Sequence, residues 1–220
     1  RSPSRGLGDV YKRQIGEKAN IALAFAGLPS GVMDLINGKA LTFLRRAVPE
    51  DLAPINQIEI ALSLSDSFNA TGLSLDGDLL SKAARATKGY AYLVQLVGYS
   101  IWQRANLHRE KSTLVSERDV DEGILLAEAR FHDVVHEPEI SGLSRNEINY
   151  LYAMCEDSRQ SKTSDLAKRL GKKTSELSSV RAKLLSREVI QAPQRGYVQF
   201  AVLDLDEYLK DNRDEILSRY

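Results

Sequence analysis

The stretch that most constrains the fold is Ala86 to Trp102, ATKGYAYLVQLVGYSIW, which reads as a polar helix end, a glycine and a second helix that is apolar on nearly every face. Leu93, Val97 and Ile101 recur at helical spacing, and apolar or aromatic side chains also cover most of the other faces. A helix that is apolar all round is buried by its neighbours. We therefore expect the rest of the chain to pack around this helix.

Two glycines punctuate the same stretch. Gly89 follows Lys88 and is predicted to end the first helix in a left-handed conformation. Gly98 lies in mid-helix, where glycine costs about 1 kcal/mol against alanine, and so indicates that another backbone passes close.

Composition limits the class of protein. The chain has 220 residues, of which 43% are hydrophobic, which is enough for one or two domains with real cores. The sequence contains no stretch of 18 consecutive apolar residues, so it predicts no membrane-spanning helix. The single cysteine, Cys155, is predicted to fill a core, and a lone thiol favours the reducing cytoplasm over a disulfide framework.

The formal net charge is zero, but the charges are unevenly distributed. Residues 15–142 hold 12 Lys and Arg against 17 Asp and Glu, whereas residues 143–203 hold 11 against 6 and residues 204–220 hold 3 against 6. The positive charge is therefore concentrated in one segment, which indicates an anionic partner for that segment.

The first 14 residues are expected to be extraneous to the fold. Asp9 to Gln14, DVYKRQ, is the translation of a transposon end used in sequencing libraries, and residues 4–8 continue that frame. On this interpretation the chain is the C-terminal part of a longer protein. The alternative is a native basic arm carrying Arg1, Arg5, Lys12 and Arg13.

The next segments predict a change from a buried sheet to a helical bundle. Ile21 to Ala26 is a short apolar run typical of a strand in a parallel sheet, so residues 15–55 are interpreted as the end of an α/β core. Residues 56–140 are predicted to form about four or five helices. In the first of these, Ile58, Ala61, Leu62 and Phe68 are expected to share the buried face, and Ser116 is expected to start a helix that ends near Pro138.

Residues 141–203 predict a winged helix-turn-helix. Ser144 begins one helix, Thr163 and Ser164 cap a second that Gly171 closes, and Thr174 begins a third. Two strands follow, joined by Pro193 to Gly196, and residues 204–220 are expected to form an acidic terminal helix. In such folds the third helix enters the major groove of DNA and basic loops hold phosphates. The candidate DNA-binding residues are Lys172, Lys173, Ser175, Ser178, Ser179, Arg181, Lys183 and Arg195. A protein partner is the alternative, since many winged helices pack against proteins.

The order of these pieces resembles a known family. The segments AGLPSGV, LTFLRRA, ATKGYAYLVQLVGYSIWQRA and LSRNEINYLYAM through QRGYVQF look like the C-terminal half of bacterial AAA+ (P-loop) ATPases of the origin-recognition or STAND-like type. The resemblance implies a remnant of a P-loop core, a helical lid and a winged helix, with ATP and Mg²⁺ bound by the full-length parent. It also implies nucleotide-sensing roles for Ser30, Arg45, Arg46 and Tyr90. Ala91 and Tyr92 stand where the family has proline and arginine, respectively.

Other chemistry is weakly indicated. No G-x-x-x-x-G-K-[ST] motif is present, so we expect no ATP hydrolysis by this chain alone. His132 and His136 have a spacing that can bind zinc, but no third ligand is apparent, and they are interpreted as ordinary histidines on a polar helix face. Two functions remain open: the lid and winged-helix part of an ATP-dependent switch, or a winged-helix DNA-binding or adaptor protein without ATPase activity.

Overall fold

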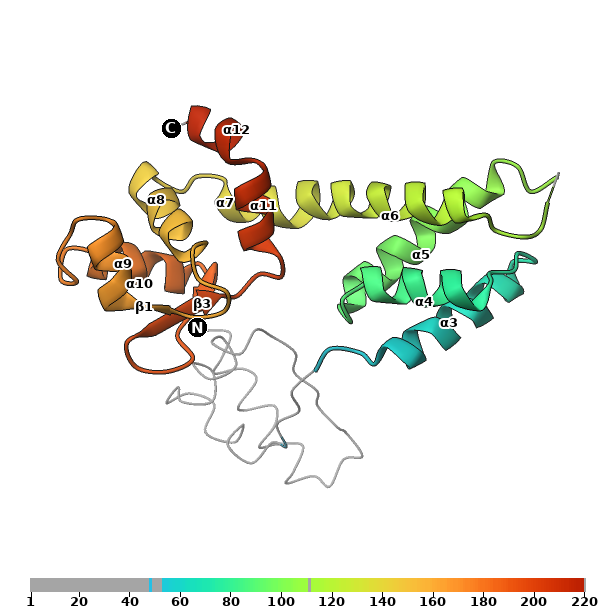
Figure 1. Ribbon diagram of the computed structural model, residues 1–220, viewed down its shortest axis with the longest axis horizontal. Helices are drawn as coiled ribbons and strands as arrows, with labels where there is room; N and C mark the ends of the chain where they lie inside the picture. Colours follow the sequence, from blue (N-terminus) through green and yellow to red (C-terminus); the bar gives the residue numbers. More distant parts are fainter. Residues whose placement is uncertain (1–47, 49–52, 111, 220) are drawn as a thin grey trace, which may run out of the picture. The chain divides into compact units, whose positions relative to one another are not determined.

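The computed structural model describes Val48, residues 53–110 and residues 112–219 (Figure 1). The chain divides into two compact units, residues 1–52 and 53–220, and every described residue except Val48 belongs to the second. The expected strand at Ile21 to Ala26 and the candidates Ser30, Arg45 and Arg46 lie outside the described residues, so the interpretation of residues 15–52 stays a prediction.

The described chain is mainly helical with one small sheet, as expected. Its first part, called here the helical bundle, consists of α3 (Gln57–Ala70), α4 (Gly77–Ala86), α5 (Ala91–Asn106) and α6 (Glu117–Phe131). Local chemistry begins two of these helices, one of them at Ser116 as predicted. The Asp76 carboxylate accepts from the Asp78 N–H, and Ser116 and Asp119 form a reciprocal capping box.

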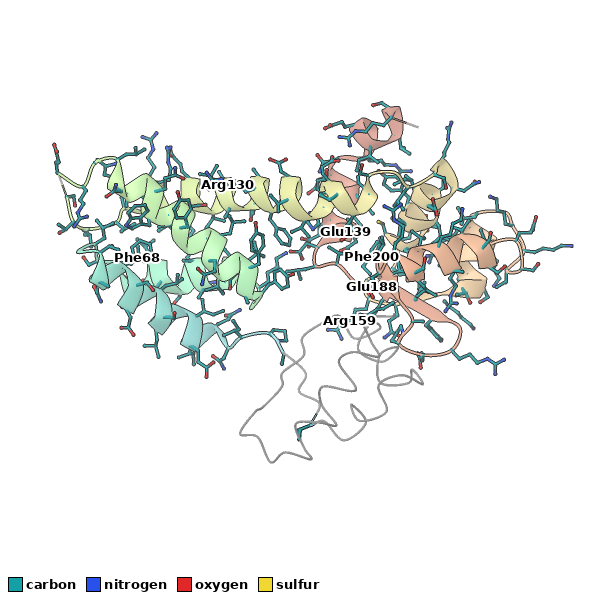
Figure 2. All side chains as sticks on the ribbon, turned by 180° about the vertical axis from the view of Figure 1, so that it is seen from behind. Phe68, Arg130, Glu139, Arg159, Glu188 and Phe200 are labelled. Atoms are coloured by element: carbon teal, nitrogen blue, oxygen red, sulfur yellow. The ribbon has the colours of Figure 1, made fainter. Side chains whose placement is uncertain are left out.

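The buried face of α3 differs in part from the expectation. In α3 the buried side chains are Ile60, Leu64 and Phe68, the last of which Figure 2 labels, whereas Ile58 and Leu62 are 71% and 62% exposed. Apolar residues occur on two faces of this helix, and helical periodicity alone cannot say which face meets α4 and α5. The expectation for Phe68 is confirmed, and those for Ile58 and Leu62 are wrong.

Helix α5 is not buried on all sides. One face packs into the bundle, but Tyr92 and Tyr99 are 39% and 52% exposed on the other faces. Ser100, which reads as a polar interruption, is fully buried, and its hydroxyl has no hydrogen-bond partner among the described residues. The buried residues of α5 are Leu93, Val97, Ser100, Ile101 and Ala105.

The glycines of α5 and α6 reveal where backbones meet. A Cβ atom on Gly98 would lie 2.9 Å from the Leu64 Cδ2 atom, so a side chain, not a backbone, passes close to Gly98. The close backbone approach occurs instead at Gly123 of α6. A Cβ atom there would lie 2.7 Å from the Cα atom and 2.8 Å from the amide nitrogen of Ile101. Gly89 has a φ of +78°, which confirms the predicted left-handed helix end.

The helix that begins at Ser116 does not end at Pro138. A π-helical turn, η2 (His132–His136), follows α6 and leads into α7 (Glu137–Ile140), and Pro138 lies in the first turn of α7. Proline lacks an N–H and is tolerated in a first turn, and the wider π turn lets the chain continue around it. No helix among the described residues is long and apolar enough to cross a membrane.

The second part has the element order of a winged helix. Helix α8 (Arg145–Met154) is followed by β1 (Ser161–Lys162), α9 (Thr163–Arg169), α10 (Ser178–Ser186), β2 (Ile190–Gln191) and β3 (Tyr197–Phe200). The strands form an antiparallel sheet in the order β1-β3-β2, with Lys162 opposite Tyr197 and Ile190 opposite Phe200. Strand β1 was not predicted, because two residues carry no period-2 pattern.

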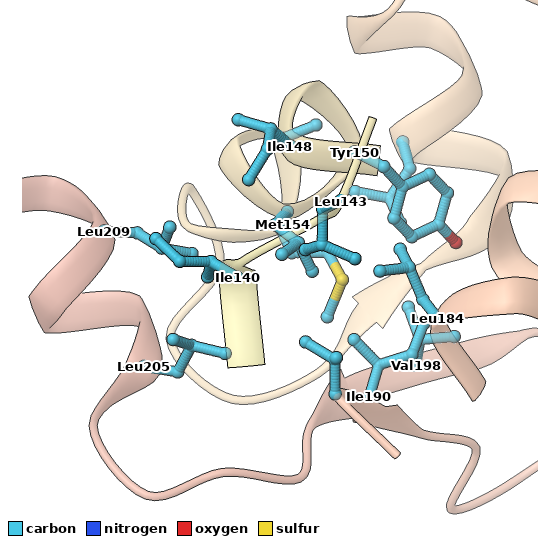
Figure 3. Packing of buried hydrophobic residues seen from close by; sticks show 14 of the residues in the cluster. Ile140, Leu143, Ile148, Tyr150, Met154, Leu184, Ile190, Val198, Leu205 and Leu209 are labelled. Atoms are coloured by element: carbon cyan, nitrogen blue, oxygen red, sulfur yellow. The ribbon is translucent and has the colours of Figure 1, made fainter. Parts of the chain in front are cut away.

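The C-terminal residues belong to the core of this second part. Instead of one acidic helix they form α11 (Leu205–Asp211) and α12 (Arg213–Ser218). Leu205 and Leu209 are fully buried in the same hydrophobic cluster as residues of α8, α10, β2 and β3 (Figure 3). Ile216 of α12 is fully buried in this cluster as well. The apolar residues of α11 and α12 therefore complete this core, and the acidic residues between them are mostly more exposed.

Candidate nucleic-acid interface

The turn before α10 presents two lysines. Gly171, with a φ of +62°, ends α9, and the Lys172 N–H donates to the Ala167 carbonyl at 2.9 Å. The Lys172 ammonium lies 3.3 Å from the Asn146 Oδ1 atom of α8. The Lys173 N–H donates to the Glu176 carboxylate at 2.6 Å, so this turn carries a negative charge beside its two positive ones.

The serines of the predicted third helix are divided between this turn and α10. Residues 174–177 form turns, and the helix begins at Ser178, not at Thr174. The Ser178 hydroxyl donates to the Ser175 carbonyl at 2.7 Å. In a helix that began earlier, a backbone N–H would donate to this carbonyl instead. Ser175, Ser178 and Ser179 are all exposed.

Arg181 does not project freely from α10. Its side chain is half-buried, and its Nε atom is fully buried without a hydrogen-bond partner among the described residues. The charge of Arg181 acts on Tyr150 of α8, whose hydroxyl is also buried without a partner in the described part of the chain. Burial raises the pKa of Tyr150 to about 12, and Arg181 only partly opposes that effect. Arg181 therefore lies partly over the core, whereas Lys183 of the same helix is exposed.

The wing is held to the start of α9 by two hydrogen bonds. Gly196, with a φ of +85°, accepts from the Thr163 N–H at 2.9 Å and from the Thr163 hydroxyl at 3.0 Å. These bonds position Arg195, which is exposed at the β2–β3 turn. They also bring Lys162 to the wing, because Lys162 pairs with Tyr197 across the sheet. Arg159 is exposed in the loop just before β1 (Figure 2).

Sequence reasoning missed Lys162 and Arg159 because it missed β1. The segment that precedes the second helix reads as a loop, and only the pairing of β1 with β3 places its cations beside the wing. The segment SRQSK carries two cations among polar residues, and so short a polar stretch does not distinguish a strand from a loop.

Two arginines of the winged helix, Arg169 and Arg187, form hydrogen bonds within the domain. Arg169 binds Asp157 through both terminal nitrogens at 2.6 Å and also donates to the Ala153 carbonyl. Arg187 donates to the carbonyls of Ser141 and Gly142. Their role is to tie α9 and α10 to the rest of the domain. Lys162, Lys173, Lys183 and Arg195 are exposed and pair with no carboxylate among the described residues.

The nucleotide-sensing candidate Tyr90 lies at the start of α5. Its ring is 45% exposed and meets Phe131 edge-on, with the ring centroids 5.9 Å apart. Tyr92 contacts the same phenylalanine at 6.2 Å. Both tyrosines therefore lie where α5 meets the end of α6, with part of each ring open.

The histidines and the cysteine belong to no group of three or more possible metal ligands in the part of the chain that the structure describes. His136 is fully buried, so its interpretation as a polar-face residue is wrong, whereas His132 is half-buried beside it. Cys155 packs against the winged-helix core, and burial raises the pKa of its thiol to about 11.

One family model matches part of the chain. A family model described as "Domain of unknown function (DUF8462)" matches residues 133–209, from η2 to α11. That match agrees with the hydrophobic cluster, which joins Ile140 to Leu209 and beyond. No curated protein matches the sequence.

Among solved structures, the chain is similar to two point mutants of RuvB from Thermotoga maritima, each at 14% identity and a TM-score of 0.39. It is also similar to "Thermotoga maritima RuvB Holliday junction branch migration motor", at 14% identity and a TM-score of 0.37. Each alignment covers 79% of this chain and 54% of the other, so the chain spans about half the length of these proteins. Because these TM-scores are low, the winged-helix assignment rests on strand order and packing alone.

Proposed function

We propose that the winged helix of this chain binds duplex DNA. The observation that carries the proposal is the set of exposed cations without carboxylate partners among the described residues, on the turn before α10, on α10 and at the wing: Lys162, Lys173, Lys183 and Arg195. In a helix-turn-helix, the helix in this position enters the major groove while cations on the flanking loops hold the phosphates.

The short side chains of α10 support the same proposal. Ser175, Ser178 and Ser179 are exposed at the start of α10, where bulky side chains would keep the backbone away from a groove. Small hydroxyl residues also hydrogen-bond to bases or phosphates without strong base preference. The arrangement therefore favours phosphate-dominated binding over the reading of a specific sequence.

We further propose that the helical bundle and winged helix belong to an ATP-dependent switch of the AAA+ type. The support is the resemblance of the sequence segments and the order of a helical bundle followed by a winged helix. In this proposal ATP and Mg²⁺ are bound by parts of the protein outside the described residues, and Tyr90 follows the nucleotide state through its position at the start of α5. The genomic sequence upstream of Ile15 tests the AAA+ proposal. It should encode a phosphate-binding loop and a strand that ends in acidic residues, and an upstream reading frame that lacks either motif would refute the proposal.

A protein partner is the second candidate, and one observation favours it. Glu176 lies in the turn between the two helices, where its carboxylate would face a DNA phosphate unfavourably. A winged-helix adaptor without ATPase activity would use the same surface for an acidic protein.

The test is the salt dependence of DNA binding by the full chain. Fluorescence anisotropy with a labelled duplex between about 50 and about 200 mM KCl should give a slope of log K against log salt of roughly −3 to −5, at about −0.9 for each phosphate contact. Replacing Lys173, Lys183 and Arg195 together by alanine should weaken binding and make the slope less negative by roughly 2 to 3.

The matched control is Arg118→Ala, which removes an exposed cation of the helical bundle. It should leave both the affinity and the slope unchanged. Undetectable or salt-insensitive binding, or a triple variant that binds as the wild type does, would contradict DNA binding and favour the protein partner.

A further inference from the structure

Charged and aromatic side chains join the helical bundle to α11. We call this group the α11 joint; its members are Lys88, Phe131, His136, Asp204, Glu207 and Tyr208. Its charged half consists of Lys88, Asp204 and Glu207. The Lys88 ammonium lies 2.8 Å from the Asp204 carboxylate and 3.0 Å from the Glu207 carboxylate. Lys88 comes from the turn between α4 and α5, two positions before Tyr90, so the joint starts beside the nucleotide-sensing candidate.

Both partners of the central ion pair have strained backbones. Lys88 has a φ of +50° and Asp204 a φ of +56°, in the left-handed region that residues other than glycine rarely adopt. Such conformations persist only where the surrounding contacts hold them, and they concentrate at switching sites. The ion pair thus depends on contacts that keep Asp204 in place.

The contact that holds Asp204 comes from the aromatic half of the joint. The preceding residue, Leu203, accepts a hydrogen bond through its carbonyl from the Nε2 atom of His136 at 2.7 Å. The His136 ring is fully buried, with centroid distances of 4.8 Å to Phe131 and 4.9 Å to Tyr208. One ring therefore contacts the end of α6, the chain entering α11, and α11 itself.

The hydrogen bond fixes which tautomer the neutral ring adopts. A carbonyl can only accept, so Nε2 carries the hydrogen and Nδ1 of the neutral ring carries none. The Nδ1 atom is buried and has no hydrogen-bond partner among the described residues. A second proton would therefore create a buried N–H donor without an acceptor, on a charged ring.

The neighbouring groups do not compensate for that charge. The hydrogen bond to Leu203 and the charge of Asp204 favour a charged His136, but His132 from η2 and Lys88 from the α4–α5 turn oppose it. Tyr208 of α11 directs its hydroxyl away, to the Glu137 carboxylate of α7 at 2.6 Å, and Glu137 is itself paired with Arg219. Burial is the largest effect, and it lowers the pKa of His136 below its ordinary value of 6.5.

We propose that His136 is a proton-sensitive latch: the neutral ring holds Leu203 and Asp204, and through them Lys88, while a protonated ring releases the helical bundle from α11. This inference goes beyond the proposed function and stands without it, since it concerns a contact within the chain.

The direction of the pH effect follows from the contacts. The neutral ring is the one that the closed joint accommodates, so the joint is closed at neutral and higher pH. When the joint is open, the His136 ring is in water and binds a proton once the pH falls below 6.5. When the joint is closed, the same ring stays neutral at that pH because its pKa is lowered. The ratio of open to closed joint should then rise by up to about tenfold per pH unit, until the lowered pKa of the closed joint is reached.

The experiment measures the distance between the two parts of the full chain. Nitroxide labels on Ser67→Cys in α3 and Ser158→Cys after α8, in a Cys155→Ala background, give the distance distribution by pulsed electron paramagnetic resonance. At pH about 7.5 a single narrow distribution is expected, and at pH about 5.5 a second, broader population. His136→Gln, which can still donate to Leu203 but does not titrate, should show the narrow distribution at both pH values.

His108→Gln is the matched control, because His108 follows α5 and pairs with Asp119 of α6, outside the α11 joint; this variant should keep the pH response. A wild-type distribution that does not change with pH, or a His136→Gln variant that responds as the wild type does, would overturn the proposal. If His136→Gln does not fold, histidine ring NMR of the wild type decides. His136 must titrate below 6.5, the ordinary value for histidine, and together with the change in distance, and a titration at or above 6.5 refutes the latch.

Discussion

Substituting Gly123 by alanine should destabilise the helical bundle, although alanine is the better helix former. Gly123 lies within α6, where it crosses α5 at Ile101. The new Cβ atom would lie 2.6 Å from the Ile101 Cγ1 atom, 2.7 Å from its Cα atom and 2.8 Å from its amide nitrogen. Real Cβ atoms do not approach other heavy atoms so closely, so the two helices must move apart.

The expected size of the effect is the difference between two terms. Helix propensity favours alanine by about 1 kcal/mol. Overpacking of a core typically costs about 1–3 kcal/mol, and two of the three contacts here are to backbone atoms, which cannot rotate away; we therefore expect a cost of about 3 kcal/mol. The net loss in the free energy of unfolding should be about 2 kcal/mol.

Two other glycines provide matched controls. A Cβ atom on Gly77, at the start of α4, meets nothing within 4 Å, so Gly77→Ala should be neutral or slightly stabilising. A Cβ atom on Gly98 meets only the end of the flexible Leu64 side chain, at 2.9 Å. In Gly98→Ala the gain in helix propensity should roughly offset a small side-chain shift, leaving stability within about 0.5 kcal/mol of the wild type.

Urea unfolding monitored through Trp102 measures the effect, because this single tryptophan lies in α5 and reports the bundle. Circular dichroism at the same urea concentrations shows whether the winged helix unfolds separately. A Gly123→Ala variant as stable as Gly77→Ala would refute the close helix crossing.

Two further predictions concern single ionisable groups. Although burial opposes it, hydrogen bonds from the Ser144 N–H and hydroxyl, both at 2.6 Å, hold the pKa of Glu147 below its ordinary value of 4.5. The stabilisation is therefore present above pH 4.5 and is lost as the pH falls; Glu147→Gln should cost about 1 kcal/mol at neutral pH, and urea unfolding should show that difference shrinking in acid. Burial raises the pKa of Cys155 to about 11, so its thiol should react with iodoacetamide at pH 8 about a hundredfold more slowly in the folded chain than in urea, and equal rates would contradict its burial.

The winged helix illustrates what could be predicted from local sequence. Ser144 with Glu147, and Ser116 with Asp119, mark helix starts because each capping box involves residues three apart. Gly171 and Gly89 could be identified as helix ends because few residues other than glycine adopt a left-handed conformation easily. The prediction failed by a turn at α10, where serine hydroxyls compete with the helix for backbone carbonyls.

Only part of the candidate interface could be predicted from the sequence. Lys173, Lys183 and Arg195 could be proposed from the order of helices and strands, and all three are exposed. Arg181 could not be separated from them, because its partial burial is a tertiary feature, and its charge acts on Tyr150, 31 positions earlier in the chain. Lys162 was missed because its place beside the wing depends on a two-residue strand.

The sequence by itself determined where several helices begin, and that the described chain is mainly helical with a small sheet in its basic segment. These features depend on caps, turns and periodicity within about one turn of each residue. Only the tertiary structure decided which face of α3 is buried, that Gly123 is where α5 and α6 meet, and that α11 completes the winged-helix core. It also decided that His136 is buried against Leu203, 67 positions away. Burial depends on the surface that a distant segment supplies, and periodicity shows that a face is apolar without showing what will cover it.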